Sequence, residues 1–288
     1  MQSLNAYINE MNNARDLMID YIDGNAALPK FDMLDSVNYP RKLKLIEVLH
    51  LIENIANNHF RCPNFYEKIE RLLHNFETEL KTNFSPNEIF NIFRSNKRVL
   101  LFLIQEKILK VNNYIFTEIT KNPDYDLYLK KPAEEKEIYE EKRKIGENDN
   151  YICQLIQKDL VEDFIKFVNK TNISLDSEIP SSLFETNQFL IGKNPTFIEY
   201  AAFYGSIQII KYMVINGVVM RPSIWLYAIH SNNSELIHYI EENEIKPPNN
   251  SYCECLIESI KCFWQDVAEY PMCQRHKGVS PIECNSIF

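Results

Sequence analysis

Glycine is scarce in this chain, with 6 residues among 288. Tight hairpin turns and phosphate-binding loops both depend on glycine, because it adopts backbone conformations that other residues avoid. The motifs Gly-x-x-x-x-Gly-Lys, Gly-x-Gly-x-x-Gly and His-Glu-x-x-His do not occur. The composition therefore argues against a protein rich in β-hairpins. The missing motifs argue against a nucleotide-phosphate loop and a zinc-protease helix.

Long apolar runs are also missing. No stretch approaches the roughly 20 residues that a membrane-spanning helix needs. The N-terminus lacks the basic start and apolar core of a secretory signal. We therefore expect an intracellular, cytoplasmic protein with no membrane contact. Its 7 cysteines should be mostly reduced thiols.

Positive charge is in deficit, since the formal net charge is −9. Proteins that bind nucleic acid neutralise phosphates with lysine and arginine. The basic clusters of this chain, such as Lys97-Arg98, are too short for that purpose. We expect no nucleic-acid partner.

One stretch, 194–218, organises the rest of the chain. Apolar residues at helical spacing predict a helix over 197–203 and a second one from Ile207, with Gly205 placed to reverse the chain between them. The pattern returns with Ala228 at the place of Ala201, 27 residues on, and again with Ser259, 31 residues after that. Short helix pairs repeated at this period predict a stack of repeats.

The stretch 194–218 resembles the ankyrin repeat, which reads Thr-Pro-Leu-His-x-Ala-Ala-x-x-Gly followed by an Ile-Val-x-x-Leu-Leu helix and Gly-Ala. Phe197 and Glu199 stand where that family has Pro and His. The residues in register are Thr196, Ile198, Ala201, Ala202, Gly205, Ile209, Ile210, Met213, Val214, Gly217 and Val218. The resemblance implies an all-α fold, an ankyrin-type helical solenoid behind a helical N-terminal region.

A wider likeness covers most of the chain up to about Tyr270. The amino-acid sequences of 62–70, 87–98 and 144–149 resemble those of divergent ankyrin-containing families. These families carry a domain of unknown function and are expanded in some parasitic protists. By itself that likeness implies no activity.

Four regions are expected. Residues 1–123 form a helical region, in which Ser85, Pro86 and Glu88 predict a capped helix start and Asn96 falls at the glycine position of a degenerate repeat. The heptad pattern of 1–23 fits either a coiled coil or a helix packed on its own domain.

The second region, 124–150, is a charged linker or solvated helix, and 151–270 holds the repeats. The first of them is half a repeat, in which Phe164 aligns on Ile209. Pro271 should end the last helix near Tyr270. Beyond it, 271–288 is an irregular tail. Phe263 and Trp264 are left partly exposed unless that tail folds back over them.

Binding of another protein on the concave face of the stack is the expected function, without enzymatic activity and without a cofactor. The ankyrin resemblance places partner contacts after the Ala-Ala pair and on the hairpin before the Thr. Aromatic residues and arginine are common interface anchors, although Phe203 could instead pack between repeats. The candidate contact residues are Phe203, Tyr204, Met220, Arg221, His230 and Ser231. The sequence leaves the partner and the oligomeric state open.

Two other functions stay open. Cys253, Cys255, Cys262, Cys273, His276 and Cys284 form a C-terminal cluster of residue types that can hold zinc in a regulatory protein. Against zinc, Cys255 and Cys262 are also spaced as apolar residues on one helix face. A cysteine-dependent enzyme would need a histidine near its nucleophile, and the 6 histidines stand in no catalytic motif.

Overall fold

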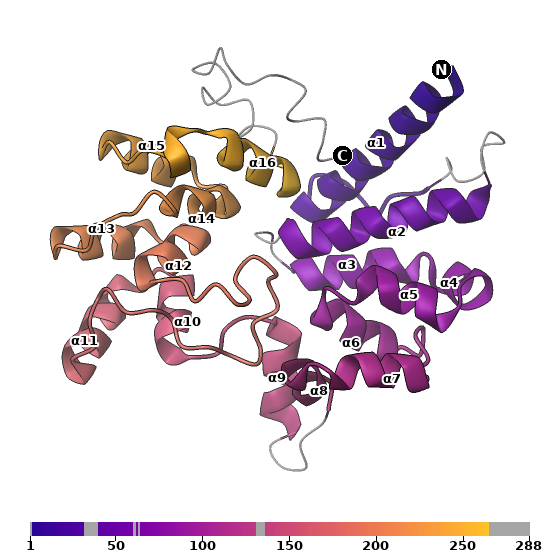
Figure 1. Cartoon of the computed structure of the whole chain (residues 1–288), viewed down its shortest axis with the longest axis horizontal. Helices are drawn as coiled ribbons and strands as arrows, with labels where there is room; N and C mark the ends of the chain where they lie inside the picture. The colour runs from indigo at the N-terminus through magenta and orange to yellow at the C-terminus, as the bar shows by residue number, and fades with distance from the viewer. Residues whose placement is uncertain (1, 32–39, 60–61, 63, 131–135, 265–288) are drawn as a thin grey trace. The chain divides into compact units, whose positions relative to one another are not determined.

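The computed structural model describes residues 2–31, 40–59, 62, 64–130 and 136–264 (Figure 1). Within them the chain forms α-helices, one 3-10 helix (η2, Pro248–Asn250) and one isolated bridge between Glu178 and Thr196. The predicted all-α class is confirmed. None of these described helices has both the length and the apolar composition needed to cross a lipid bilayer.

The chain divides into two compact units. Unit 1 comprises Met1–Glu147 and Thr186–Phe189, and unit 2 comprises Asn148–Glu185 and Leu190–Phe288. The change of unit after Glu147 falls within the charged range 124–150. That range holds two helices rather than a bare linker, and the side chains of Tyr128 and Arg143 in it are fully buried.

Unit 1 is built from helices that pack in two rows. Its helices are α1 (Gln2–Asp23), α2 (Arg41–Asn58), α3 (Phe65–His74), α4 (Glu77–Asn83), α5 (Pro86–Phe93), α6 (Lys97–Gln105), α7 (Asn113–Thr120), α8 (Pro123–Leu129) and α9 (Lys136–Ile145). Helix α5 lies against both α2 and α7, and α6 lies against both α3 and α8. Helix α1 packs on α2 and α3 and buries Ala14 and Met18. Packing on its own domain is therefore the outcome for residues 1–23.

The predicted start of α5 is confirmed in detail. Glu88 donates its backbone N–H to Ser85 Oγ at 3.3 Å, and the Glu88 carboxylate accepts from the Ser85 N–H at 2.7 Å. Pro86 occupies the first turn, where a missing N–H costs nothing. Asn96 begins α6, since its side chain accepts from the N–H groups of Arg98 and Val99.

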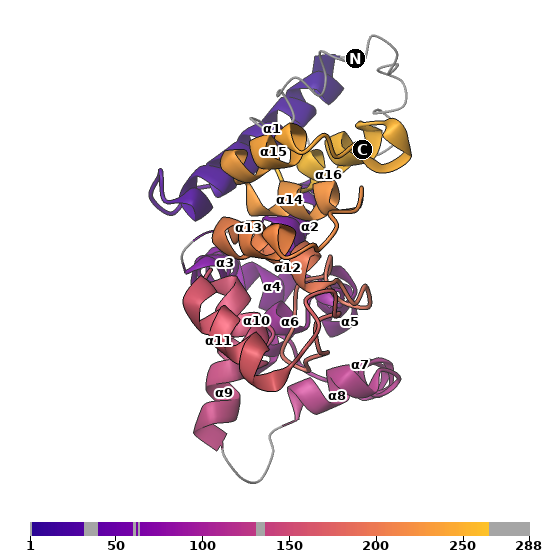
Figure 2. The same ribbon diagram turned by 90° about the vertical axis from the view of Figure 1, so that its left-hand side faces the viewer.

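Unit 2 contains successive helical hairpins. Its helices are α10 (Tyr151–Gln157), α11 (Val161–Thr171), α12 (Phe197–Tyr204), α13 (Ile207–Ile215), α14 (Ile224–Ser231), α15 (Ser234–Glu242) and α16 (Cys253–Lys261). The first helices of the hairpins contact one another in order, α10 on α12, α12 on α14 and α14 on α16, and α11 contacts α13. Figures 1 and 2 show this order of α10, α12, α14 and α16 from two directions.

One turn recurs after each first helix. Asp159, Gly205, Asn232 and Phe263 all have positive φ, at 50°, 70°, 48° and 60°. Each donates its N–H to the carbonyl three residues earlier. The turn is the left-handed helix end that glycine favours and asparagine tolerates. A Cβ on Gly205 would lie 3.2 Å from both Ser231 Cβ and Asn233 Nδ2, so the next hairpin also approaches closely there.

The recurring turn corrects the register of the first hairpin. The sequence pattern aligned Phe164 with Ile209, an offset of 45. In the structure Asp159 occupies the place of Gly205, so Phe164 corresponds to Ile210. The small residues aligned in the later hairpins are all buried: Ala201 and Ala228 are 0% exposed and Ser259 is 1% exposed.

Polar bonds join consecutive hairpins. The Asp159 carboxylate accepts from the N–H groups of Gln208 and Ile209, both at 3.0 Å, and so satisfies the start of α13 from the preceding hairpin. A different bond joins the next pair of hairpins, because the side-chain amide of Asn233 donates to the Gly205 carbonyl at 3.2 Å. Hydrogen bonds between hairpins therefore accompany the apolar packing of their first helices.

The expected exposure of the last two described residues depended on the position of the tail. Trp264 is buried, with 8% exposure, and Phe263 is half-buried. Phe263 takes the left-handed conformation at the C-terminal end of α16. The predictions for Pro271, Tyr270 and the tail 271–288 lie outside the described residues.

Candidate functional site

Four of the six candidate contact residues are buried. Phe203, Tyr204, Met220 and His230 have exposed fractions of 0, 5, 7 and 2%. The ring of Phe203 lies 5.1 Å from that of Tyr204 and 5.2 Å from that of His230, between centroids. Phe203 and His230 thus pack between hairpins, the alternative that the sequence already allowed for Phe203.

The burial of these side chains has a local cause. The first helices contact one another directly, so the face after the Ala-Ala pair of α12 meets α14 instead of solvent. Ser231 is half-buried and donates its hydroxyl to the Ala228 carbonyl at 2.6 Å. Arg221 is exposed and keeps its place as a surface candidate.

Two exposed apolar residues near Arg221 were missed. Ile215 at the end of α13 is 83% exposed, and Val219 in the connection to α14 is 73% exposed. Val218 and Met220, on either side of Val219, are buried. This in-and-out alternation is typical of an extended segment, and the apolar run 218–220 was the available signal. Ile215, Val219 and Arg221 are called the 215–221 surface below.

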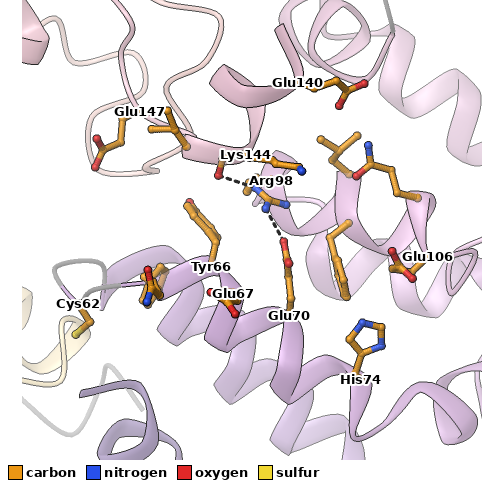
Figure 3. Close-up of a pocket in the computed structure, with 16 residues that line it drawn as sticks. Cys62, Tyr66, Glu67, Glu70, His74, Arg98, Glu106, Glu140, Lys144 and Glu147 are labelled. Atoms are coloured by element: carbon orange, nitrogen blue, oxygen red, sulfur yellow. Dashed lines mark hydrogen bonds and ion pairs between the residues drawn. The ribbon is translucent and has the colours of Figure 1, made fainter. Parts of the chain in front are cut away.

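Unit 1 has a cavity of about 720 Å³ bordered by α3, α6 and α9 (Figure 3). Its titratable lining is mainly acidic. The charged residues are Glu67, Glu70, Glu106, Glu140, Glu147, Arg98 and Lys144. Aromatic rings of Tyr66 and Phe102 also line it. Carboxylates beside aromatic rings are suited to a cationic group.

Arg98 is held in place in this cavity by hydrogen bonds to its neighbours. Its guanidinium donates to Glu70 at 2.5 Å and to the Lys144 carbonyl at 3.2 Å, as the dashed lines of Figure 3 mark. It also lies 5.3 Å from the ring centroid of Tyr66. Because Arg98 is 7% exposed, its charge serves to hold α3, α6 and α9 together.

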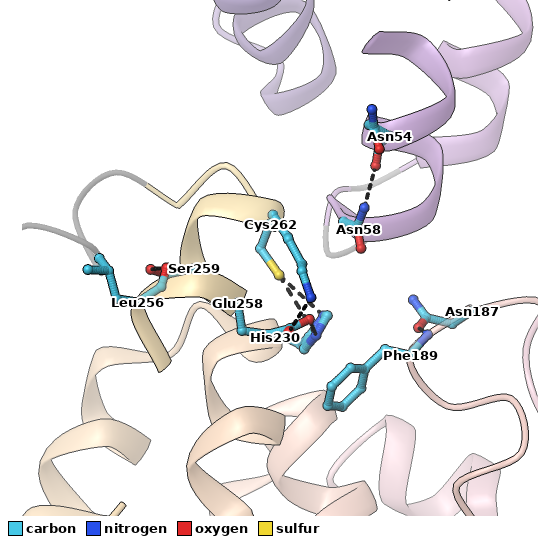
Figure 4. Close-up of polar contacts among 10 residues, drawn as sticks. Asn54, Asn58, Asn187, Phe189, His230, Leu256, Glu258, Ser259 and Cys262 are labelled. Atoms are coloured by element: carbon cyan, nitrogen blue, oxygen red, sulfur yellow. Dashed lines mark hydrogen bonds and ion pairs between the residues drawn. The ribbon is translucent and has the colours of Figure 1, made fainter. Parts of the chain in front are cut away.

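A polar cluster in unit 2 joins α14 to α16 (Figure 4). His230 Nε2 lies 3.0 Å from Glu258 Oε1, and Cys262 Sγ lies 3.4 Å from His230 Nδ1. Burial is the main influence on the pKa of His230 and lowers it, against the opposing effect of Glu258. Burial acts to raise the pKa of Glu258, but its hydrogen bond with His230 gives a net lowering.

The order Cys–His–Glu matches the order of nucleophile, base and orienting group in cysteine enzymes. Burial opposes that chemistry here. Cys262 is 0% exposed, and burial raises the pKa of its thiol well above the usual value. A reactive cysteine requires an accessible thiolate, so the geometry of Cys262 gives no support for nucleophilic catalysis.

The C-terminal zinc candidates separate in the structure. Cys253 is half-buried and Cys255 is fully buried on α16, while Cys262 faces His230. Cys273, His276 and Cys284 lie outside the described residues. Sequence spacing missed His230 and Glu258 as neighbours of Cys262, because their proximity depends on how α14 and α16 pack.

The described architecture is that of an all-α protein with stacked helical hairpins in its second unit. No family model matches the chain, and no curated protein or solved structure is significantly similar to it.

Proposed function

We propose that the chain is an ankyrin-type solenoid that binds a protein partner. The observation that supports it is the left-handed turn that recurs at Asp159, Gly205, Asn232 and Phe263 behind first helices that pack in order. Stacked repeats of this kind present extended surfaces and have no requirement for a catalytic centre. The resemblance of 194–218 to the ankyrin repeat supports the same reading.

The 215–221 surface is the partner-binding candidate in unit 2. Two strongly exposed apolar side chains and an exposed arginine, close together in the sequence, have the composition of an interface anchor. Met220 is buried next to Val219, whereas Phe203, Tyr204 and His230 stand at the C-terminal ends of α12 and α14, away from this surface. Substitution of those four residues would report on packing more than on partner contact.

Site-specific cross-linking tests the proposal. A photo-reactive amino acid at Val219 of the full chain should give a discrete cross-linked protein from cells that express the chain naturally. The same amino acid at Lys170, exposed on α11, is the control. When Ile215→Asp is added to the chain that carries the photo-reactive amino acid at position 219, we expect the cross-linked product to disappear while the helical content stays unchanged. Equal products from both positions, or none from Val219, would reject this surface.

The acidic cavity of unit 1 favours a second candidate, binding of a cationic segment of a partner. Five glutamates line it against one arginine and one lysine. A labelled arginine-rich peptide should bind the full chain, and added salt should weaken binding. The double substitution Glu106→Gln with Glu147→Gln should reduce affinity several-fold, whereas Glu47→Gln, on an exposed face of α2, should not. Binding that is equal in all three proteins would exclude the cavity.

A further inference from the structure

Three potential metal ligands meet between α14 and α16. His230 stands near the end of α14, and Glu258 and Cys262 stand four residues apart on α16 and its C-cap, hence on one face. Their donor atoms all lie within 4.8 Å of one another. His230 and Cys262 have exposed fractions of 2 and 0%, so water has little access to two of the three donors.

The donor types and spacings suit zinc. Zn²⁺ binds imidazole nitrogen, thiolate sulfur and carboxylate oxygen at roughly 2.0–2.3 Å, which sets tetrahedral donors about 3.3–3.6 Å apart. His230 Nε2 lies 3.0 Å from Glu258 Oε1 and 3.8 Å from Cys262 Sγ. Shifts of a few tenths of an ångström would bring these two distances to those values, and the third pair, Glu258 and Cys262, is separated by at most 4.8 Å.

The charge balance also suits a divalent ion. One thiolate and one carboxylate with a neutral imidazole neutralise Zn²⁺, which lowers the cost of placing the ion among buried groups. Two ammonium groups are near the cluster: Lys261 Nζ lies 3.2 Å from Glu258 Oε2, and Lys193 interacts with Glu258 through its charge.

We propose that His230, Glu258 and Cys262 bind one Zn²⁺ ion and thereby clamp α16 onto α14. The ion binds His230 Nε2, and the imidazole proton moves to Nδ1. It replaces the proton of the Cys262 thiol, which is released to solvent. A water molecule completes the tetrahedron. This site differs from a cysteine-rich one, because it takes a single sulfur.

Zinc titration of the full chain tests the proposal. After removal of metal with a chelator, competition with a chromogenic zinc indicator should show one equivalent bound, together with a rise in Tm. Cys262→Ala and Glu258→Gln should each lower the affinity at least tenfold. Cys255→Ala, a buried cysteine on the same helix, and Cys62→Ser, which lies beside Asp23 and His59, should leave it unchanged. Absence of stoichiometric binding, or its loss in Cys62→Ser, would overturn the assignment.

X-ray absorption of the zinc-loaded natural sequence gives a readout that needs no substitution. One sulfur and one imidazole in the first coordination sphere are expected. Two or more sulfurs would overturn the proposal in favour of a site built from several cysteines. If the cluster is only a hydrogen-bonded chain from Cys262 through His230 to Glu258, zinc will change neither Tm nor the absorption spectrum.

Discussion

Ser223 donates its hydroxyl to Glu199 Oε1 across 2.6 Å and so connects the hairpin of α12 to that of α14. The other carboxylate oxygen, Oε2, accepts from both the N–H and the hydroxyl of Thr196 at 2.9 Å. Glu199 therefore closes a capping box and bonds to the next hairpin at once. In the ankyrin pattern histidine occupies this place, and here a carboxylate makes bonds both within the hairpin and between hairpins.

Glu199 and Ser223 should be energetically coupled. We expect Ser223→Ala to lower the free energy of unfolding by about 1 kcal/mol and Glu199→Ala by about 2 kcal/mol, since the latter also loses the cap. The double variant should lose less than the two single losses combined, by about 0.5–1.5 kcal/mol. Urea denaturation measures all three. Glu162→Ala, at the exposed start of α11, is the control, and strict additivity would show that the bond contributes nothing.

Ala201→Glu should destabilise unit 2 strongly. Ala201 is 0% exposed on α12, which lies between α10 and α14, so the new carboxylate would be buried without a partner. A loss of at least about 3 kcal/mol is expected. Thermal denaturation measures it against Gln208→Glu, which adds the same charge at an exposed position of α13. Equal melting temperatures for the two variants would contradict the packing of α12.

Substitution should cost much more at Gly205 than at Asn232, although both residues occupy the same turn. Gly205→Ala places a Cβ at a φ of 70° and near Ser231, and should cost about 1–3 kcal/mol. Asn232→Gly relaxes a φ of 48° at the equivalent turn, and its effect should stay within about 0.5 kcal/mol. Chemical denaturation gives both values. A Gly205→Ala variant as stable as the natural sequence would show that the turn is not constrained.

Glu88 should titrate far below an ordinary glutamate. The hydrogen bond from Lys42, and then that from the Ser85 N–H, lower the pKa of Glu88 from 4.5 to about 2. Because the folded-state pKa is the lower one, the stabilisation by Glu88 is present above pH 4.5 and is lost as the pH falls toward 2. NMR titration of the carboxyl carbon measures the value. Lys42→Met should raise it, and an unchanged pKa would remove Lys42 as the main cause.

Local signals in the sequence predicted the all-α class and the ends of particular helices. Ser85 and Glu88 define a capping box within four residues, and Gly205 marks a helix end by its own backbone preference. Phe263 gives no such signal, because an aromatic residue is held in the left-handed conformation only by its surroundings. The sequence pattern misplaced the first hairpin by one residue for the same reason, because Asp159 gives no clear signal of a left-handed turn.

The candidate site was less accessible to sequence reasoning. Whether Phe203 faces solvent depends on how closely α14 packs on α12, and no residue pattern specifies that distance. The neighbours of Cys262 show the same limit, since His230 precedes it by 32 residues. The apolar run 218–220 marks its segment in the sequence, but which of its residues is exposed follows only from the structure.

The bonds from Asp159 to α13 also bear on the connection between α11 and α12. Asp159 reaches backbone groups 49 and 50 residues further along, whereas Asn233 bonds to a group 28 residues away. Both fasten one hairpin to its neighbour through space, independently of the chain that runs between them. Adjacent hairpins are thus bonded through space both where the connecting segment is long, as at 172–196, and where it is short, as at 216–223.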